Sequence, residues 1–164
     1  MFGRDFERLK HYRELHSTSP LGAGASAGST LPIDPVTTAR GLEFERSFEN
    51  SYDVAGDRDF VLELLQIGTQ LMLHVSRLAE DFIYMASSGA AWLELPQSLC
   101  TGSSMMPQKR NPDFAELARG KSGRIFGNLV ALLTMLKGLP LTYNRDLQED
   151  KEALFDTVDV LVPT

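Results

Sequence analysis

We predict an all-α protein built as a bundle of long helices, and three features of the sequence support this fold class. Two long stretches carry apolar residues at every third or fourth position, which is the spacing of one helix face. No proline interrupts either stretch, and nothing in the sequence indicates β-structure. The 164 residues, 43% of them hydrophobic, suffice for one ordinary domain and are too apolar for a disordered chain.

The N-terminal part predicts a helix, an irregular segment and a short helix. Residues 1–16 are dense in charge and place Phe2 and Phe6 at helical spacing, so they suit the end of an amphipathic helix. Residues 17–35 are rich in Gly, Ala, Ser and Pro and should be irregular. We expect a flexible or substrate-covering loop there rather than a dinucleotide site, because no strand precedes its glycines. Residues 36–43 suit a short helix.

The strongest helical pattern runs from about residue 53 to residue 87. Its apolar positions are Phe60, Leu64, Ile67, Leu71, Val75, Leu78, Phe82 and Met85. Further apolar residues, among them Leu65 and Leu73, widen this face beyond one stripe. A helix that is apolar on more than one side needs more than one neighbour, which favours burial in a multi-subunit bundle.

Two more helices are expected in the C-terminal half. Residues 90–111 form a connection, and a helix follows over about 112–137, with Pro112 well placed in its first turn. The segment 138–140 contains Gly and Pro and ends this helix. A third helix should cover about 145–161.

Composition excludes several classes of partner and site. The net charge of −6, with both signs interspersed, argues against nucleic-acid binding. His11, His16 and His74 have no metal-ligand spacing, so we expect no metal, and we expect His74 to be structural.

Cys100 is the only cysteine, and we interpret it as a passive apolar residue rather than a reactive thiol. Because neither a signal peptide nor a membrane-length apolar run is visible, we expect a cytoplasmic protein.

The segment 101–111 concentrates polar chemistry in a loop. It holds two serine hydroxyls, a lysine amine and an asparagine amide, with Gly102 before them and Pro107 among them. Glycine and proline at these positions disrupt regular backbone structure, so the segment is neither a helix nor a strand. On composition alone an ordinary polar turn is the simpler interpretation, although reactive side chains are often carried on such loops.

Residues 102–111 read GSSMMPQKRN and fit every fixed position of the GSSxMPxKxN signature of the fumarase/aspartase superfamily. The flanking passages resemble the argininosuccinate lyase/delta-crystallin family within it. These passages are residues 19–25, 57–63 and 137–151. The last of them separates this family from fumarases and aspartases.

The resemblance implies the central part of the fumarase/aspartase-type fold. Proteins of the family are homotetramers whose long helices form a central bundle, and each active site draws segments from three subunits. They use no cofactor. Residues 1–164 resemble only a partial central helical domain, so we expect the N-terminal and C-terminal domains to be absent, together with the Thr-x-x-His segment that carries the catalytic histidine. We therefore expect the isolated chain to be inactive.

The signature assigns catalytic roles by resemblance. Ser103 aligns with the serine that acts as acid or base, most favourably in proton abstraction, and Lys109 could stabilise the negative charge that develops. Asn111 could donate hydrogen bonds to a substrate carboxylate, and Ser104 suits a backbone or substrate contact. Glu116 aligns with the glutamate that pairs with the catalytic histidine. The simpler alternatives are a turn hydroxyl for Ser103, a solvated amine for Lys109 and a helix-dipole carboxylate for Glu116.

Three downstream residues align with the family's substrate-binding positions. They are Tyr143, Gln148 and Lys151. Gln148 and Lys151 are three positions apart and project from one helix face, where an amide and an amine suit a ligand with carboxylates. The alternative is a solvated face, and we expect the neighbouring acidic residues to lie on the surface.

The function implied by the resemblance is elimination of fumarate from the small-molecule substrate argininosuccinate. The other product is arginine, in arginine biosynthesis or the urea cycle. A non-catalytic delta-crystallin-like structural protein is the alternative from a different class, because such proteins can keep the signature. An adenylosuccinate lyase-like enzyme is the runner-up, and the passage 143–151 argues against it.

Overall fold

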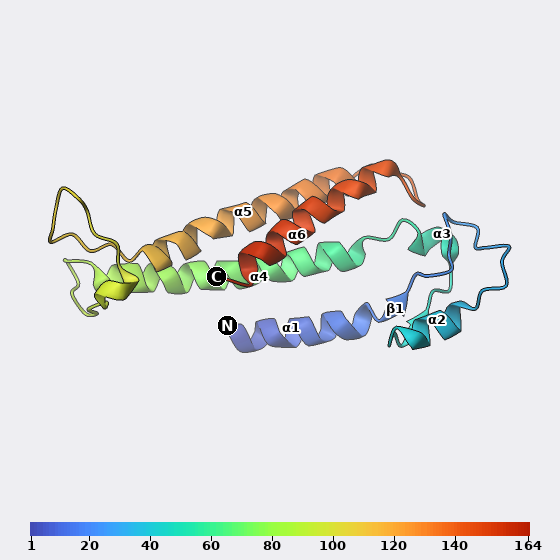
Figure 1. The fold of residues 1–164 in the computed structure, drawn as a ribbon, viewed down its shortest axis with the longest axis horizontal. Helices are drawn as coiled ribbons and strands as arrows, with labels where there is room; N and C mark the ends of the chain where they lie inside the picture. The colour runs from blue at the N-terminus through green and yellow to red at the C-terminus, as the bar shows by residue number, and fades with distance from the viewer.

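Two long antiparallel helices, α4 and α5, form the axis of the molecule (Figure 1). The computed structural model describes residues 1–164. The helices are α1 (Phe2–Leu15), α2 (Pro35–Gly41), α3 (Ser51–Val54), α4 (Asp59–Ala86), α5 (Asp113–Leu136) and α6 (Asp150–Leu161), with 3₁₀ turns η1 (Gln97–Leu99) and η2 (Arg145–Glu149) and strands β1 (Thr18–Ser19) and β2 (Arg46–Ser47). The predicted all-α class and helical bundle are confirmed.

The core forms where α6 packs across the seam between α4 and α5. One cluster joins Val61 and Leu65 of α4 to Leu132 of α5 and Ala153 of α6. A second cluster, further along the seam, is made by Met72, Ile125 and Val160. Because each cluster draws on all three helices, the seam fixes their relative positions.

Polar contacts add to this packing on the α6 side. The Asp156 carboxylate accepts hydrogen bonds from Arg124 and Asn128 of α5. These hydrogen bonds, first from Arg124 and then from Asn128, hold the pKa of Asp156 below its usual range. The pair is exposed, so it adds less stability than the apolar clusters do.

Helix α1 packs on α4 through a buried polar contact. The Nδ1 atom of His74 lies 2.6 Å from Oδ2 of Asp5, and both residues are buried. Arg8 donates to the other oxygen of Asp5 at 2.8 Å, and the Phe2 ring meets His74 edge-on. The prediction of a structural histidine at position 74 is confirmed by this geometry.

The predicted helix over 53–87 is wrong at its start. The chain forms the short α3, leaves it, and begins α4 only at Asp59. The Asp57 carboxylate, one residue before the N-cap Arg58, accepts a hydrogen bond from the N–H of Asp59, the first residue of α4, at 2.8 Å. Gly56 packs against the Thr142 carbonyl, far away in the sequence, and a local pattern cannot reveal this contact.

Two smaller expectations also need correction. The segment 145–161 is not one continuous helix, because η2 occupies its first five residues before α6 begins. Residues 17–35 are irregular apart from β1 and the start of α2 at Pro35, and β1 pairs in parallel with β2. With two residues in each strand, this pair is too short to show the alternation of apolar and polar residues by which a strand is predicted.

Several large apolar side chains on α4 and α5 face solvent in the single chain. They include Leu73, Tyr84, Leu117, Val130 and Leu133. Leu117 is 63% exposed and Val130 is 60% exposed, so the apolar surface extends beyond the seam. This agrees with the expectation that the helix now seen as α4 is apolar on more than one side, and α5 shares this property. None of the helices combines the length and the apolar character needed to cross a membrane.

Replacing Gly56 by alanine should destabilise the chain. An added Cβ would lie 2.5 Å from the Thr142 carbonyl oxygen, so the backbone must shift at a cost of about 1–3 kcal/mol. Gly120→Ala is the matched control, because Gly120 lies inside α5 with open space around it and should gain about 1 kcal/mol of helix propensity. Urea unfolding of residues 1–164 measures both. Equal effects of the two substitutions would contradict the contact.

Candidate functional site

The polar loop is a closed unit at one end of the bundle. Thr101 and Asn111 form an isolated antiparallel bridge, with backbone N···O distances of 3.2 and 3.0 Å in the two directions. The loop between them projects beyond the C-terminal end of α4 and leads into α5 (Figure 1). A further backbone hydrogen bond, from the Lys109 N–H to the Met106 carbonyl at 3.0 Å, folds the loop tip into a turn.

Ser103 and Asn111 are the two half-buried residues of this loop, whereas Ser104 and Lys109 are exposed. The Met105 N–H donates to Ser103 Oγ at 3.2 Å. A hydroxyl oxygen that accepts a backbone N–H is stabilised when it loses its proton, because the donor compensates the negative charge. The same contact also fits the turn hydroxyl that was the simpler alternative.

Glu116 lies at the root of the loop, in the first turn of α5. Its backbone N–H donates to the Pro112 carbonyl, and its side chain is exposed. Nearby, Arg119 of α5 donates to Glu80 of α4 at 2.5 Å, and the Phe82 and Phe114 rings pack 6.2 Å apart. These contacts attach the start of α5 to the end of α4 and leave the Glu116 carboxylate available to another group.

The three substrate-binding candidates form one chain of hydrogen bonds. The Gln148 amide nitrogen donates to the Tyr143 hydroxyl oxygen at 2.6 Å, and Lys151 Nζ donates to the Gln148 amide oxygen at 3.0 Å. Gln148 is in η2 and Lys151 is in the first turn of α6. Because the backbone at Glu149 and Asp150 is helical, their spacing of three residues places the two side chains on one face. Gln148 and Lys151 thus lie on one face, as the sequence predicted, and Tyr143 joins them through Gln148.

Sequence reasoning missed two residues beside this chain, Asp150 and Arg58. Asp150 was expected on the surface with the other acidic residues, but it is only 6% exposed. Its Oδ2 accepts a hydrogen bond from Arg58 Nε, and its Oδ1 accepts from Lys151 Nζ at 3.4 Å. A signal for its burial was available, because Asp150 lies three residues after buried Leu147 and three before buried Ala153.

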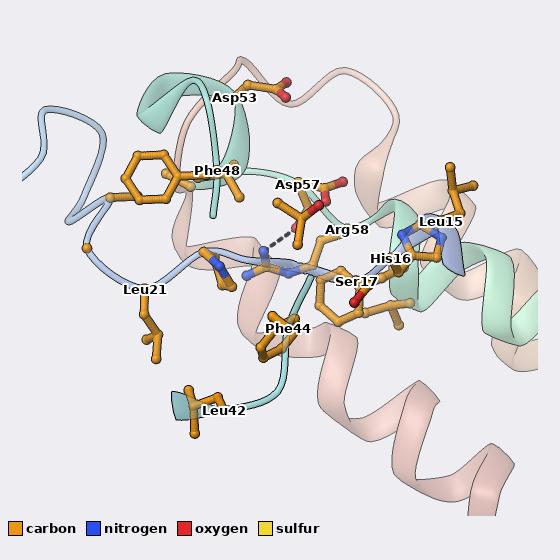
Figure 2. Close-up of a pocket in the computed structure, with 18 of the residues that line it drawn as sticks. Leu15, His16, Ser17, Leu21, Leu42, Phe44, Phe48, Asp53, Asp57 and Arg58 are labelled. Atoms are coloured by element: carbon orange, nitrogen blue, oxygen red, sulfur yellow. Dashed lines mark hydrogen bonds between the residues drawn. The ribbon is translucent and has the colours of Figure 1, made fainter. Parts of the chain in front are cut away.

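A cleft of about 1370 Å³ opens next to this cluster (Figure 2). Its wall includes Arg58, Asp150 and Lys151. The rest of its lining includes the end of α1, the Gly-rich segment after it and residues of the segment 53–57. The labelled side chains in Figure 2 combine apolar groups such as Phe44 and Phe48 with polar groups. A ligand with both apolar and charged parts would find complementary surfaces in this cleft.

A second polar pair borders the cleft. His16 Nε2 lies 2.6 Å from Glu63 Oε2, and the Tyr12 ring packs against the His16 ring with 4.8 Å between centroids. Burial raises the pKa of Tyr12, and the Glu63 carboxylate raises it further. No cluster of three His, Cys, Asp or Glu side chains is arranged to hold a metal ion, and Cys100 is a half-buried free thiol.

The loop and the hydrogen-bonded cluster lie at opposite ends of α4. Arg58 immediately precedes this helix, whereas the loop lies beyond its last residue, Ala86. A helix of 28 residues is about 42 Å long at 1.5 Å per residue. The candidate residues therefore form two groups in the single chain, and no small molecule could contact both.

Known proteins resemble this chain in sequence and in structure. It is 57% identical over 161 residues to an argininosuccinate lyase of Thermosynechococcus vestitus, a match that covers 98% of the chain and 35% of the relative. An argininosuccinate lyase of Geobacillus kaustophilus is 53% identical over 162 residues, or 99% of the chain and 35% of the relative. The chain thus spans about a third of the length of these curated relatives.

Solved structures share the fold. The crystal structure of an EDDS lyase in complex with formate has a TM-score of 0.84 and 27% identity, covering 96% of this chain and 33% of that one. A class II fumarase from Schistosoma mansoni, with a TM-score of 0.81 and 20% identity over 97% of this chain and 38% of that one, shares the fold alone. A family model described as "Lyase" matches residues 1–127, well over half of the sequence, and the chain belongs to that lyase family.

Proposed function

We propose that residues 1–164 form the central helical domain of an argininosuccinate lyase, which eliminates fumarate from argininosuccinate and releases arginine. The observation that carries this proposal is the 57% identity to an argininosuccinate lyase over 98% of the chain. The polar loop and the cleft-side cluster support it. The loop provides a half-buried hydroxyl, and the cluster provides an amine and an amide, which suit a carboxylate-bearing ligand. We further propose a role in arginine biosynthesis and a cytoplasmic location, which the lone cysteine supports.

In the proposed reaction Ser103 acts as the base. Its oxygen takes a proton from the carbon next to a substrate carboxylate, and the electron pair of that C–H bond forms the C=C bond of fumarate as the C–N bond breaks. The Met105 N–H, 3.2 Å from Ser103 Oγ, would stabilise the deprotonated serine. Lys109 and Asn111 on the same loop would stabilise the negative charge that builds on the carboxylate. This chemistry needs proton transfer and placed charges, so the proposal includes no metal or cofactor.

An acid must also protonate the leaving nitrogen. We propose that Glu116 supports a histidine that performs this step or orients its partners, because its carboxylate is exposed at the root of the loop. A carboxylate next to an imidazole favours the protonated form and fixes the orientation of the ring. We further propose that Ser104, which is exposed beside Ser103, contacts the substrate or the backbone around it.

The substrate would be held at the cleft by Tyr143, Gln148 and Lys151. Argininosuccinate carries three carboxylates and one guanidinium group, so an ammonium group and a phenol match its acidic end. The cleft is large enough for a molecule of that size and has acidic as well as basic residues in its lining. Uniform binding of this kind lowers KM without contributing directly to the chemical step.

A complete site would combine copies of the chain. The loop and the cleft-side cluster are about 40 Å apart along α4 in one chain, judged from the helix rise. The exposed apolar surface of α4 and α5 offers the area through which further copies could pack and bring a second loop to the cleft. We therefore propose a homotetramer with shared active sites.

A chimera tests the proposed reaction. Residues 1–164 replace the 161 matched residues of the T. vestitus argininosuccinate lyase, which supplies the rest of the enzyme. We expect release of fumarate from argininosuccinate within about tenfold of the relative's rate, since equivalent groups would occupy equivalent places. Ultraviolet absorbance of fumarate measures the rate. A folded, inactive chimera would favour a crystallin-like structural protein, and turnover of adenylosuccinate instead would favour the runner-up enzyme.

Ser103→Ala in the active chimera should lower kcat by about 10²–10⁴-fold, because general-base catalysis contributes about that much. Ser104→Ala is the matched control and should lower kcat less than about tenfold, because a contact to backbone or substrate is worth one hydrogen bond. Steady-state kinetics with argininosuccinate compare the two variants. A larger loss of kcat in Ser104→Ala than in Ser103→Ala would contradict the assignment and indicate that Ser104 is the base.

Mixing two impaired variants, assayed at a substrate concentration below KM, tests the shared site. One chimera carries Ser103→Ala and the other Lys151→Met, and the two are co-expressed with different affinity tags and purified as mixed oligomers. If Ser103 and Lys151 of one site come from different copies, about a quarter of the sites in a random mixture contain both intact residues. Each homogeneous variant is its own control. Mixed oligomers no more active than these controls would contradict the shared site.

A further inference from the structure

The Asp150 carboxylate is a constrained polar group outside the assigned residues. It is buried at the start of α6, yet both its oxygens are hydrogen-bonded. Arg58 Nε donates to Oδ2, and Arg58 Nη1 donates to the Asp57 carbonyl at 2.6 Å, so the guanidinium is itself fixed. The side chain of Arg58 is only 14% exposed. A buried carboxylate held in this way has little freedom to rotate.

The held carboxylate restricts Lys151 in turn. Lys151 is half-exposed and has four rotatable bonds, so it would otherwise sample many orientations. Its ammonium group donates to Asp150 Oδ1 at 3.4 Å and to Gln148 Oε1 at 3.0 Å. Two of its three N–H bonds are thereby directed, and the third remains available to a ligand.

The direction of these hydrogen bonds also determines what Tyr143 can do. Because Gln148 accepts from Lys151 through its amide oxygen, its NH₂ group must face Tyr143. The Tyr143 oxygen therefore accepts a hydrogen bond, and its own O–H proton is left to donate elsewhere. One Lys151 N–H and the Tyr143 O–H are thus both presented as donors, which suits an anionic acceptor.

The charges explain why Arg58 is needed. Asp150 alone would neutralise the ammonium charge of Lys151 and weaken its attraction for an anion. Arg58 balances the Asp150 charge, so the three side chains together keep one net positive charge beside the cleft. The carboxylate can then orient Lys151 without cancelling it.

We propose that Asp150, anchored by Arg58, is a positioning residue that orients Lys151 and Gln148 so that their cluster binds a substrate carboxylate. The inference rests on the proposed function for the identity of the substrate. The orientation of Lys151 and Gln148 depends only on hydrogen bonds within this chain. In this proposal Asp150 acts through Lys151 and takes no part in the chemistry.

The first test measures orientation in residues 1–164 without any activity. NMR of the lysine ammonium groups reports Lys151 as a signal shifted from those of solvated lysines and protected from rapid exchange. Asp150→Asn keeps the size of the side chain and removes its charge, and it should return the Lys151 signal to the solvated range. Asp156→Asn is the matched control, because it removes another α6 carboxylate that pairs with an arginine, Arg124, and should leave Lys151 unchanged. An unchanged Lys151 signal in Asp150→Asn would overturn the proposal.

The second test measures binding in the active chimera. Asp150→Asn should raise KM for argininosuccinate about tenfold or more and leave kcat within about threefold, because it weakens binding in ground and transition states alike. A purely structural role would instead reduce the amount of folded enzyme, which lowers the apparent kcat and leaves KM unchanged. Asp156→Asn should alter neither constant by more than about twofold.

A conservative variant keeps the proposal testable if Asp150→Asn does not fold. If Asp150→Asn does not fold, Asp150→Glu keeps the charge but moves the carboxylate by one methylene, and it should show the same rise in KM. An unaltered KM in the folded variant would overturn the role in binding. An inactive parent chimera would count against the proposed function alone, and the NMR result would then decide whether Asp150 orients Lys151.

Discussion

The packing of α4 against α5 is the constraint on which the rest of the structure depends. Leu65 and Leu132 are completely or almost completely buried at this seam, and α6 closes it from the side. The same seam holds the root of the polar loop at one end and the hydrogen-bonded cluster at the other. A change in the register of the two helices would therefore displace both groups of candidate residues at once, although neither group contributes to the apolar core.

The long helices could be predicted from the sequence because their signal is local. An apolar residue at every third or fourth position shows which face is buried, whatever it packs against. The interruption between α3 and α4 could not be predicted in this way, because distant residues cause it. Arg58 is bonded to Asp150, 92 positions away, and Gly56 fits against the Thr142 carbonyl. The parallel pair of strands was missed because two residues in each strand are too few to show an alternating pattern.

The candidate site, like the fold, could be predicted only in part from the sequence. Resemblance supplied the loop residues and the Tyr143, Gln148 and Lys151 cluster. The hydrogen bond between Gln148 and Lys151 agrees with the common face predicted for these two residues. Asp150 was misjudged as a surface residue because its acidic neighbours dominated the interpretation, although its spacing from Leu147 and Ala153 indicated burial. The distance between the loop and the cluster could not be predicted from the sequence, because a motif specifies residue types and says nothing about how far apart two passages lie in the fold.

The length of α4 acts as a spacer between the two groups. Each residue added to a helix advances it by about 1.5 Å and turns everything beyond it by about 100°. A single insertion in α4 would thus swing the loop around the axis while the cleft stayed in place, and the seam with α5 would lose its match. Insertion of seven residues would restore the direction approximately but move the two ends apart by about 10 Å. The interior of α4 can therefore vary in composition on its exposed side, while the number of residues between Arg58 and the loop is fixed by geometry.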